Sequence, residues 1–150
     1  MSKLPQIGTS IFTVMSKMAT EYNAINLSQG FPNFAIDQRL SDIVSRLSKE
    51  NVHQYLPMSG FHPLLNKIAT LVYNSYGRTI QAESEILVTA GATQAIFTTI
   101  TALVNSGDEV ILLDPSYDCY EAPILLCNAK PIRVALNDDY TPNWEQIEKA

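Results

Sequence analysis

The stretch ILVTAGATQAIFTTITALV, residues 86–104, decides the fold that we expect for this chain. Its first residues, 86–89, predict a short strand, and the apolar residues after Thr93 recur with the period of a helix. Only small residues, Ala90 to Thr93, separate the two. Such a turn has two interpretations: the small residues allow strand and helix to pack closely, or bare backbone N–H groups at the helix N-terminus bind an anion such as phosphate.

The chain continues the same alternation of strand and helix. Residues 109–113 (EVILL) form a continuous apolar run, as expected for a strand that is covered on both faces, and Asp114-Pro115 ends it. A helix is predicted over Tyr117–Leu126 and another strand over 130–136. This β-α-β-α-β order with short connections predicts a parallel sheet with right-handed crossovers.

The anion interpretation gains support from this topology. In parallel sheets of this kind, ligands bind beyond the carboxyl ends of the strands. The turns at residues 90–93 and 114–117 both follow predicted strands, so we expect them to share one rim of the sheet.

The rest of the chain predicts mainly helices. Thr9-Ser10 and Asp37 are suited to cap the first two, and Pro63 fits the first turn of the third. The expected elements are a helix from Ile11 to Tyr22, a short strand-like piece running into a Gly/Pro loop over 24–34, helices over 40–47 and from Pro63 to Gly77, and an amphipathic helix from Trp144 after a cap at 141–143.

Composition excludes several classes of function. The chain has 150 residues, 46% of them hydrophobic, and a net charge of −5 without any basic run, so we expect no nucleic-acid binding. No apolar run approaches a membrane span and no signal peptide is recognisable, which predicts a cytoplasmic protein that does not contact a membrane. Cys119 and Cys127 are expected two turns apart on one helix, too far to bridge, and two histidines without a cysteine cluster predict no metal site.

Four stretches together resemble class I pyridoxal-phosphate aminotransferases of fold type I, with the greatest similarity to the kynurenine and methionine aminotransferase subgroup. They are INLSQGFPNF (25–34), HQYLPMSGFHPLLNKIA (53–69), ILVTAGATQAIFTTITALVNSGDEVILLDPSYDCYEAP (86–123) and TPNWEQIE (141–148). The resemblance implies an α/β fold with an N-terminal arm and helices that lead into a mainly parallel sheet flanked by helices. Residues 1–50 would form the arm and part of the small domain, and residues 51–150 the first part of the large cofactor-binding domain.

The resemblance also implies that the chain is the front part of a longer one. The family's lysine that forms a Schiff base with the cofactor is expected after residue 150, together with the residues that tune the pyridine ring and the arginine that binds the substrate carboxylate. Five lysines of this chain do not match the position of the family's Schiff-base lysine. They are Lys17, Lys49, Lys67, Lys130 and Lys149. The 150 residues alone are therefore expected to be inactive.

Three cofactor contacts are implied by the resemblance. Gly91, Ala92 and Thr93 match the turn that holds the cofactor phosphate, and Tyr117 matches the aromatic residue that stacks on the pyridine ring. Tyr55 matches a tyrosine that reaches the phosphate in the neighbouring subunit of a homodimer. The alternatives are close packing at the turn, an ordinary half-buried Tyr117 and a surface Tyr55.

Two substrate contacts are implied as well. Gly30 matches a glycine whose main chain lies against the substrate carboxylate, where a side chain would block the approach. Phe12 falls where the subgroup carries an aromatic residue at the substrate side-chain pocket. A plain tight turn at Gly30 and a helical core role for Phe12 are the alternatives.

The leading functional hypothesis is an aminotransferase that uses pyridoxal 5'-phosphate to move an amino group from a methionine-like or kynurenine-like amino acid to a 2-oxo acid. A carbon–sulfur β-lyase with the same fold and cofactor is a second enzyme hypothesis. A non-catalytic ligand-binding regulator of this fold is an alternative of another class. A nucleotide-binding α/β domain is disfavoured because neither GxGxxG nor GxxxxGK occurs.

Overall fold

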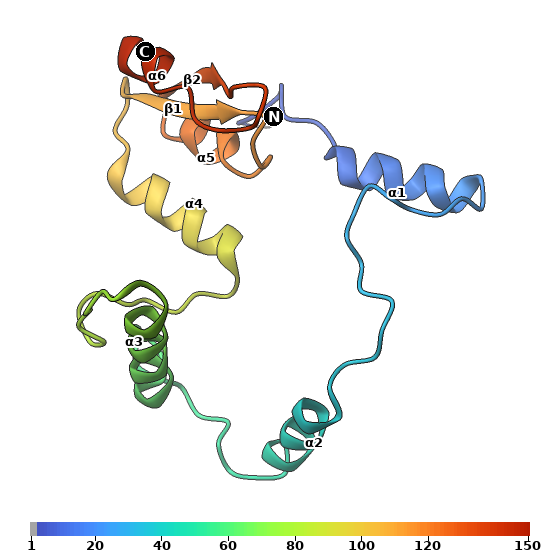
Figure 1. Cartoon of the computed structure of the whole chain (residues 1–150), viewed down its shortest axis with the longest axis vertical. Helices are drawn as coiled ribbons and strands as arrows, with labels where there is room; N and C mark the ends of the chain where they lie inside the picture. The colour runs from blue at the N-terminus through green and yellow to red at the C-terminus, as the bar shows by residue number, and fades with distance from the viewer. Residues whose placement is uncertain (1–2) are drawn as a thin grey trace. The chain divides into compact units, whose positions relative to one another are not determined.

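The computed structural model describes residues 3–150, which fall into two compact units. The first unit contains the chain up to Ser28 and Ala90–Ala150, and the second contains Gln29–Thr89. Among the described residues, no helix combines the length and the hydropathy that crossing a bilayer requires. Figure 1 labels the elements in chain order: α1 (Ile11–Glu21), α2 (Gln38–Leu47), α3 (His62–Tyr76), α4 (Ala92–Leu103), β1 (Glu109–Asp114), α5 (Glu121–Leu126), β2 (Lys130–Ala135) and α6 (Trp144–Lys149).

A β-α-β unit organises the first unit of the chain. Strands β1 and β2 pair in parallel, in register from Glu109 with Lys130 to Asp114 with Ala135, and α5 lies on the connection between them. The predicted apolar run of β1 is confirmed as a strand. Its carboxyl end at Asp114 leads directly into the loop that contains Tyr117.

The core of this unit lies where α5 covers the two strands. Ile124 of α5 is fully buried and clusters with Leu112 of β1 and with Ala129, which precedes β2. Partly buried side chains from α4 and its C-cap, from β1 and from the two caps of α5 pack against that cluster: Ile100, Val104, Val110, Tyr120 and Cys127.

The predicted helix caps of the first unit are confirmed. Ser10 caps α1, because its Oγ accepts a hydrogen bond from the Thr13 N–H at 3.4 Å. Asn143 caps α6, with its Oδ1 accepting from the Gln146 N–H at 3.0 Å. Both side chains satisfy donors that have no partner inside the helix.

The second unit is built around α3. Pro63 lies in its first turn and Gly77 ends it in the left-handed conformation, with φ 66°, as predicted. Leu65 is the buried residue of this helix, at 2% exposure. Asp37 caps α2 by accepting from the Arg39 N–H at 2.9 Å, and the Arg39 guanidinium beside it lowers the pKa of the Asp37 carboxyl.

Gly60 lies where the segment before α4 comes close to the turn before α3. The Val88 N–H donates to the Ser59 carbonyl oxygen at 3.0 Å. At Gly60, φ is +122° and an added Cβ would stand 3.1 Å from the Val88 Cβ. Both the backbone conformation and the close approach therefore require glycine at this position.

The prediction of a strand over 86–89 is wrong for the described residues. These residues have no regular secondary structure, so the expected β-α-β-α-β order is reduced to the single unit of β1, α5 and β2. The strand-like piece expected within 24–34 is likewise irregular, and Ile25 and Leu27 are exposed. An extended apolar segment becomes a strand only when it joins the hydrogen-bond ladder of a sheet, and the two-stranded sheet of the described residues contains neither segment.

The helix expected over Tyr117–Leu126 begins later, at Glu121. Pro123 explains the difference, because proline lacks an N–H and fits only the first turn, where the N–H groups have no partner in the helix. Cys119 consequently lies in the turn before α5, and the expectation that both cysteines share one helix is wrong. Both cysteines are free.

The buried position of Ile124 gives a first prediction. In the full-length protein, Ile124→Ala should lower the free energy of unfolding by about 2–5 kcal/mol, because it leaves a cavity between α5 and the strands. Ile124→Val removes less of the side chain and should lower it by only about 0.5–1.5 kcal/mol. Chemical denaturation measures both values, and equal losses in the two variants would contradict the packing described for this residue.

Candidate functional site

The turn before α4 depends on an unusual backbone conformation at Gly91. This residue is the N-cap of α4, with φ 94° and ψ 161°, a combination that is essentially restricted to glycine. A Cβ added there would meet no described atom within 4 Å. Close packing therefore does not explain the glycine at this position, whereas the backbone conformation does.

The N-terminus of α4 differs from the N-termini of α1, α2 and α6. No side chain caps it, whereas Ser10, Asp37 and Asn143 cap the other three. The first N–H groups of a helix have no partner inside it and carry partial positive charge. Ala92 and Thr93, the first two residues of α4, are exposed. Their N–H groups are suited to bind an anion.

Gln94 stabilises this turn, a role that the sequence analysis did not assign. Its Oε1 accepts a hydrogen bond from the Ala90 N–H at 2.6 Å, which ties the residue before Gly91 to the first turn of α4. The signal was present in the sequence, since a glutamine at the third helical position often reaches back to the N-terminal backbone.

Tyr117 lies in the irregular loop between β1 and α5. It is 50% exposed, so its ring has both protein neighbours and free surface. The ring centroid lies 6.3 Å from that of Phe12 in α1 and 6.2 Å from that of Tyr120. The structure thus brings two of the predicted site residues, Phe12 and Tyr117, into one aromatic cluster.

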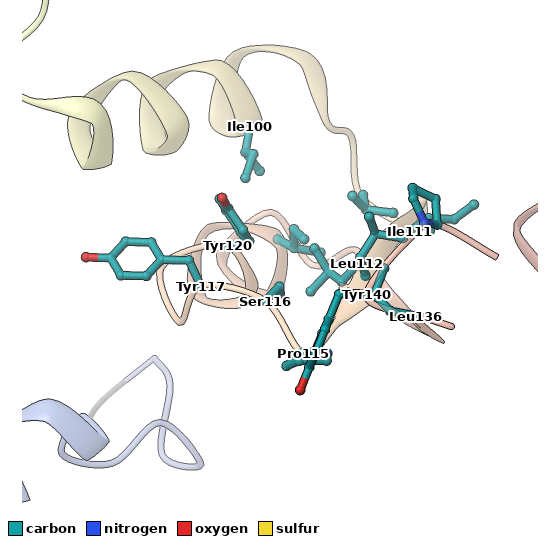
Figure 2. Close-up of a pocket in the computed structure, with 13 residues that line it drawn as sticks. Ile100, Ile111, Leu112, Pro115, Ser116, Tyr117, Tyr120, Leu136 and Tyr140 are labelled. Atoms are coloured by element: carbon teal, nitrogen blue, oxygen red, sulfur yellow. The ribbon is translucent and has the colours of Figure 1, made fainter. Parts of the chain in front are cut away.

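A hollow of about 540 Å³ borders this aromatic cluster (Figure 2). Tyr117 and Tyr120 lie beside each other along it, and Ser116 and Pro115 belong to the same loop. Ile100 also lines it, so α4 and the Tyr117 loop border the same space. The hollow reaches α4 only at Ile100, two turns after the helix begins, and residues 90–93 do not line it. That the turns at 90–93 and 114–117 share one rim therefore stays a prediction.

A second hollow, of about 440 Å³, reaches Tyr117 from the N-terminal arm. Residues 6–11 line it, and so do Glu121 of α5 and Arg133 of β2. The Arg133 Nη2 donates to the Glu121 Oε2 at 2.8 Å, a half-exposed ion pair that joins the start of α5 to β2. Tyr117 therefore lies between two hollows of the first unit.

Cys119 is not suited to act as a nucleophile beside this loop. Burial raises the pKa of its thiol, and the negative charge of Asp118 raises it further. The reactive form of cysteine is the thiolate, so a raised pKa keeps the group inert near neutral pH. Among the described residues, no three His, Cys, Asp or Glu side chains are grouped to hold a metal ion.

The remaining predicted site residues, Gly30 and Tyr55, belong to the second unit. Tyr55 is fully exposed, and Gly30 is exposed with no described atom within 4 Å of an added Cβ. Space and exposure fit the predicted contacts of both residues, but neither role is tested by the structure. Both stay predictions, as do the phosphate and ring contacts of Gly91, Ala92, Thr93 and Tyr117 and the substrate contact of Phe12.

The parallel β-α-β unit and the uncapped N-terminus of α4 belong to an α/β fold, and comparison with known proteins defines its family. The profile of the family described as aminotransferase class I and II matches residues 22–150. The chain therefore belongs to this family, as the resemblance predicted.

Curated relatives agree with this assignment. The chain is 45% identical over 147 residues to a methionine aminotransferase of Escherichia coli, covering 97% of this chain and 38% of that protein. It is 39% identical over 134 residues to a kynurenine–oxoglutarate transaminase of Dictyostelium discoideum, covering 88% of this chain and 31% of the relative. The chain thus spans less than two fifths of the length of these relatives.

Solved structures show the same fold. The chain superposes on the methionine aminotransferase of Escherichia coli with a TM-score of 0.91 at 44% identity, covering 99% of this chain and 39% of that one. The N-succinyldiaminopimelate aminotransferase from Mycobacterium tuberculosis gives a TM-score of 0.91 at 33% identity, with 100% and 40% covered. The predicted fold type I architecture is confirmed, with the chain as a partial α/β segment of it.

The backbone of Gly91 gives a second prediction. Gly91→Ala should destabilise the full-length protein by about 1–3 kcal/mol, because alanine is strained in this conformation even though space for its Cβ exists. Gly8→Ala is the matched control, since Gly8 also has no atom within 4 Å of an added Cβ but lacks the positive φ. Thermal or chemical unfolding compares the two variants. A loss at Gly91 no larger than that at Gly8 would contradict the backbone argument.

Proposed function

We propose that the protein to which this chain belongs is a pyridoxal-phosphate-dependent aminotransferase that passes an amino group from an amino acid to a 2-oxo acid. The observation that carries the proposal is the family match over residues 22–150, combined with an uncapped helix N-terminus after Gly91. The family implies the cofactor, and the residues of this chain can be tested for their fit to it.

The chain provides a fitting partner for each end of the cofactor. A phosphate needs hydrogen-bond donors without nearby side chains, and the N–H groups of the exposed residues Ala92 and Thr93 at the α4 N-terminus fit that need. A pyridine ring needs a flat apolar surface, and the half-exposed ring of Tyr117 offers one. Gly91, Ala92, Thr93 and Tyr117 are therefore the proposed cofactor-binding residues.

The chain's own residues would position the reacting groups. Pyridoxal phosphate, when bound, supplies the electron sink that weakens a bond at the substrate's α-carbon. The α4 N-terminus would fix the phosphate, and Tyr117 would set the plane of the ring. Gly30 would leave space for the substrate carboxylate, and Phe12 would border the substrate side chain.

Methionine-like or kynurenine-like amino acids are the proposed donors. Relatives named for methionine and for kynurenine match at 45% and 39% identity. The neighbouring rings of Phe12 and Tyr117 supply the apolar surface that such side chains require. A cytoplasmic location remains part of the proposal.

The proposal includes a homodimer in which Tyr55 serves the site of the neighbouring subunit. Tyr55 is fully exposed in the second unit, so its hydroxyl is free to reach outside its own chain. Exposed tyrosines are enriched at protein interfaces because the ring is apolar and the hydroxyl polar.

An assay with two product readouts tests the function. The full-length protein, loaded with pyridoxal phosphate, is incubated with methionine or kynurenine and a 2-oxo acid, and the new oxo acid and amino acid are measured. We expect both in equal amounts. A parallel incubation with a cysteine conjugate tests the β-lyase, which pyruvate and ammonia as the main products would favour. Cofactor binding without any turnover would favour the ligand-binding regulator.

Removing the Tyr55 hydroxyl gives a third prediction. A hydrogen bond to a charged group contributes roughly 1.5–3 kcal/mol, so Tyr55→Phe should bind pyridoxal phosphate about tenfold more weakly, the lower end of that range. The variant should stay dimeric by light scattering, because only one oxygen is lost. Unchanged affinity, or a monomeric active wild-type protein, would contradict the proposed role. Tyr76→Phe is the control, since Tyr76 is an exposed tyrosine at the end of α3 with no proposed contact.

A further inference from the structure

We propose that Tyr120 is a positioning residue that sets the orientation of the Tyr117 ring. This inference rests on the proposed function, because Tyr117 is the ring that would stack on the cofactor. Nothing in the sequence patterns singled out Tyr120, and its role follows from the geometry of the loop between β1 and α5.

Tyr117 has little backbone structure to hold it. It lies in an irregular segment after β1, and residues 118–120 form a turn that leads into α5. Half of its surface is exposed. A ring in such a loop needs side-chain contacts to keep one orientation, and a stacking residue is useful only when its plane is fixed.

Tyr120 supplies such a contact in a favourable geometry. The two ring centroids are 6.2 Å apart with an angle of 75° between the planes, so an edge of one ring meets the face of the other. Aromatic pairs prefer this edge-to-face arrangement at centroid distances of about 4.5–7 Å. Figure 2 shows the two rings beside each other along the hollow.

Tyr120 packs against the buried core of the unit, whereas Tyr117 is half-exposed. It is the N-cap residue of α5 and packs against the buried cluster of Leu112, Ile124 and Ala129. The contact therefore connects the half-exposed ring to the core between the sheet and α5. Phe12 of α1 makes a second contact with Tyr117, with the ring centroids 6.3 Å apart and the ring planes at 46°. Tyr120 is only three residues from Tyr117 in the chain.

The mechanism that follows is indirect. Tyr120 holds the Tyr117 ring, and Tyr117 faces the cofactor. Loss of the Tyr120 ring should leave Tyr117 in several orientations, of which only some can stack. The phosphate contacts at Ala92 and Thr93 do not involve Tyr120, so cofactor binding should weaken without being abolished.

The experiment compares Tyr120→Leu, Tyr120→Phe and Val104→Ala in the full-length protein. Pyridoxal phosphate affinity and the visible circular dichroism of the bound cofactor are measured. Tyr120→Leu should bind the cofactor about two- to tenfold more weakly and change the dichroism, since the ring contact is lost. Tyr120→Phe keeps the ring and should match the wild type.

Val104→Ala controls for core stability, because Val104 packs against the same buried cluster without a ring contact to Tyr117. It should lose stability but keep the wild-type affinity and spectrum. Adding Tyr120→Leu to Tyr117→Leu should weaken affinity no further, because Tyr120 acts through the Tyr117 ring. Should Tyr120→Leu fail to fold, Tyr120→Met replaces it with the same expectation, since methionine adapts to irregular gaps.

The outcomes separate this inference from the proposed function. An unchanged affinity and spectrum in Tyr120→Leu, an equal loss in Val104→Ala, or an additional loss in the double variant would overturn the role of Tyr120. A wild-type protein that gains no cofactor absorbance would instead overturn the proposed function itself.

Discussion

The parallel pairing of β1 with β2 determines where the candidate site can form. The strands stay in register from Glu109 with Lys130 to Asp114 with Ala135, and α5 covers them with the fully buried Ile124. Because β1 ends at Asp114, the chain leaves the sheet at its carboxyl edge, where parallel sheets bind ligands. Tyr117 follows three residues later, so its place depends on the register of the strands and on the packing beneath α5.

The two halves of the candidate site meet different physical demands. At α4, a backbone conformation that only glycine adopts easily is combined with the absence of a side-chain cap, and this leaves main-chain donors at a positively polarised helix end. At Tyr117, the demand is a flat surface with a fixed plane, which side chains must provide because the loop is irregular. One half is therefore built from backbone and the other from rings.

The sequence predicted the local features well because local chemistry controls them. The caps at Ser10, Asp37 and Asn143 and the helix end at Gly77 were all recognisable from residue type. The strand over 86–89 was not predictable in the same way, because a strand requires a place in a sheet, and the sheet of the described residues consists of β1 and β2 alone. The start of α5 was predicted too early because the effect of Pro123 on the N–H groups was overlooked. Tyr120 was missed because ring contacts depend on loop geometry, which leaves no periodic pattern in the sequence.

The central claim is that the backbone at Gly91–Thr93 holds the phosphate while Tyr117 holds the ring of one cofactor. The most direct test is a crystal structure of the full-length protein with pyridoxal phosphate bound. The account predicts phosphate oxygens within hydrogen-bond distance, about 2.7–3.2 Å, of the N–H groups that begin α4, and a pyridine ring stacked on Tyr117. A phosphate bound elsewhere, or a cofactor ring that does not touch Tyr117, would contradict it.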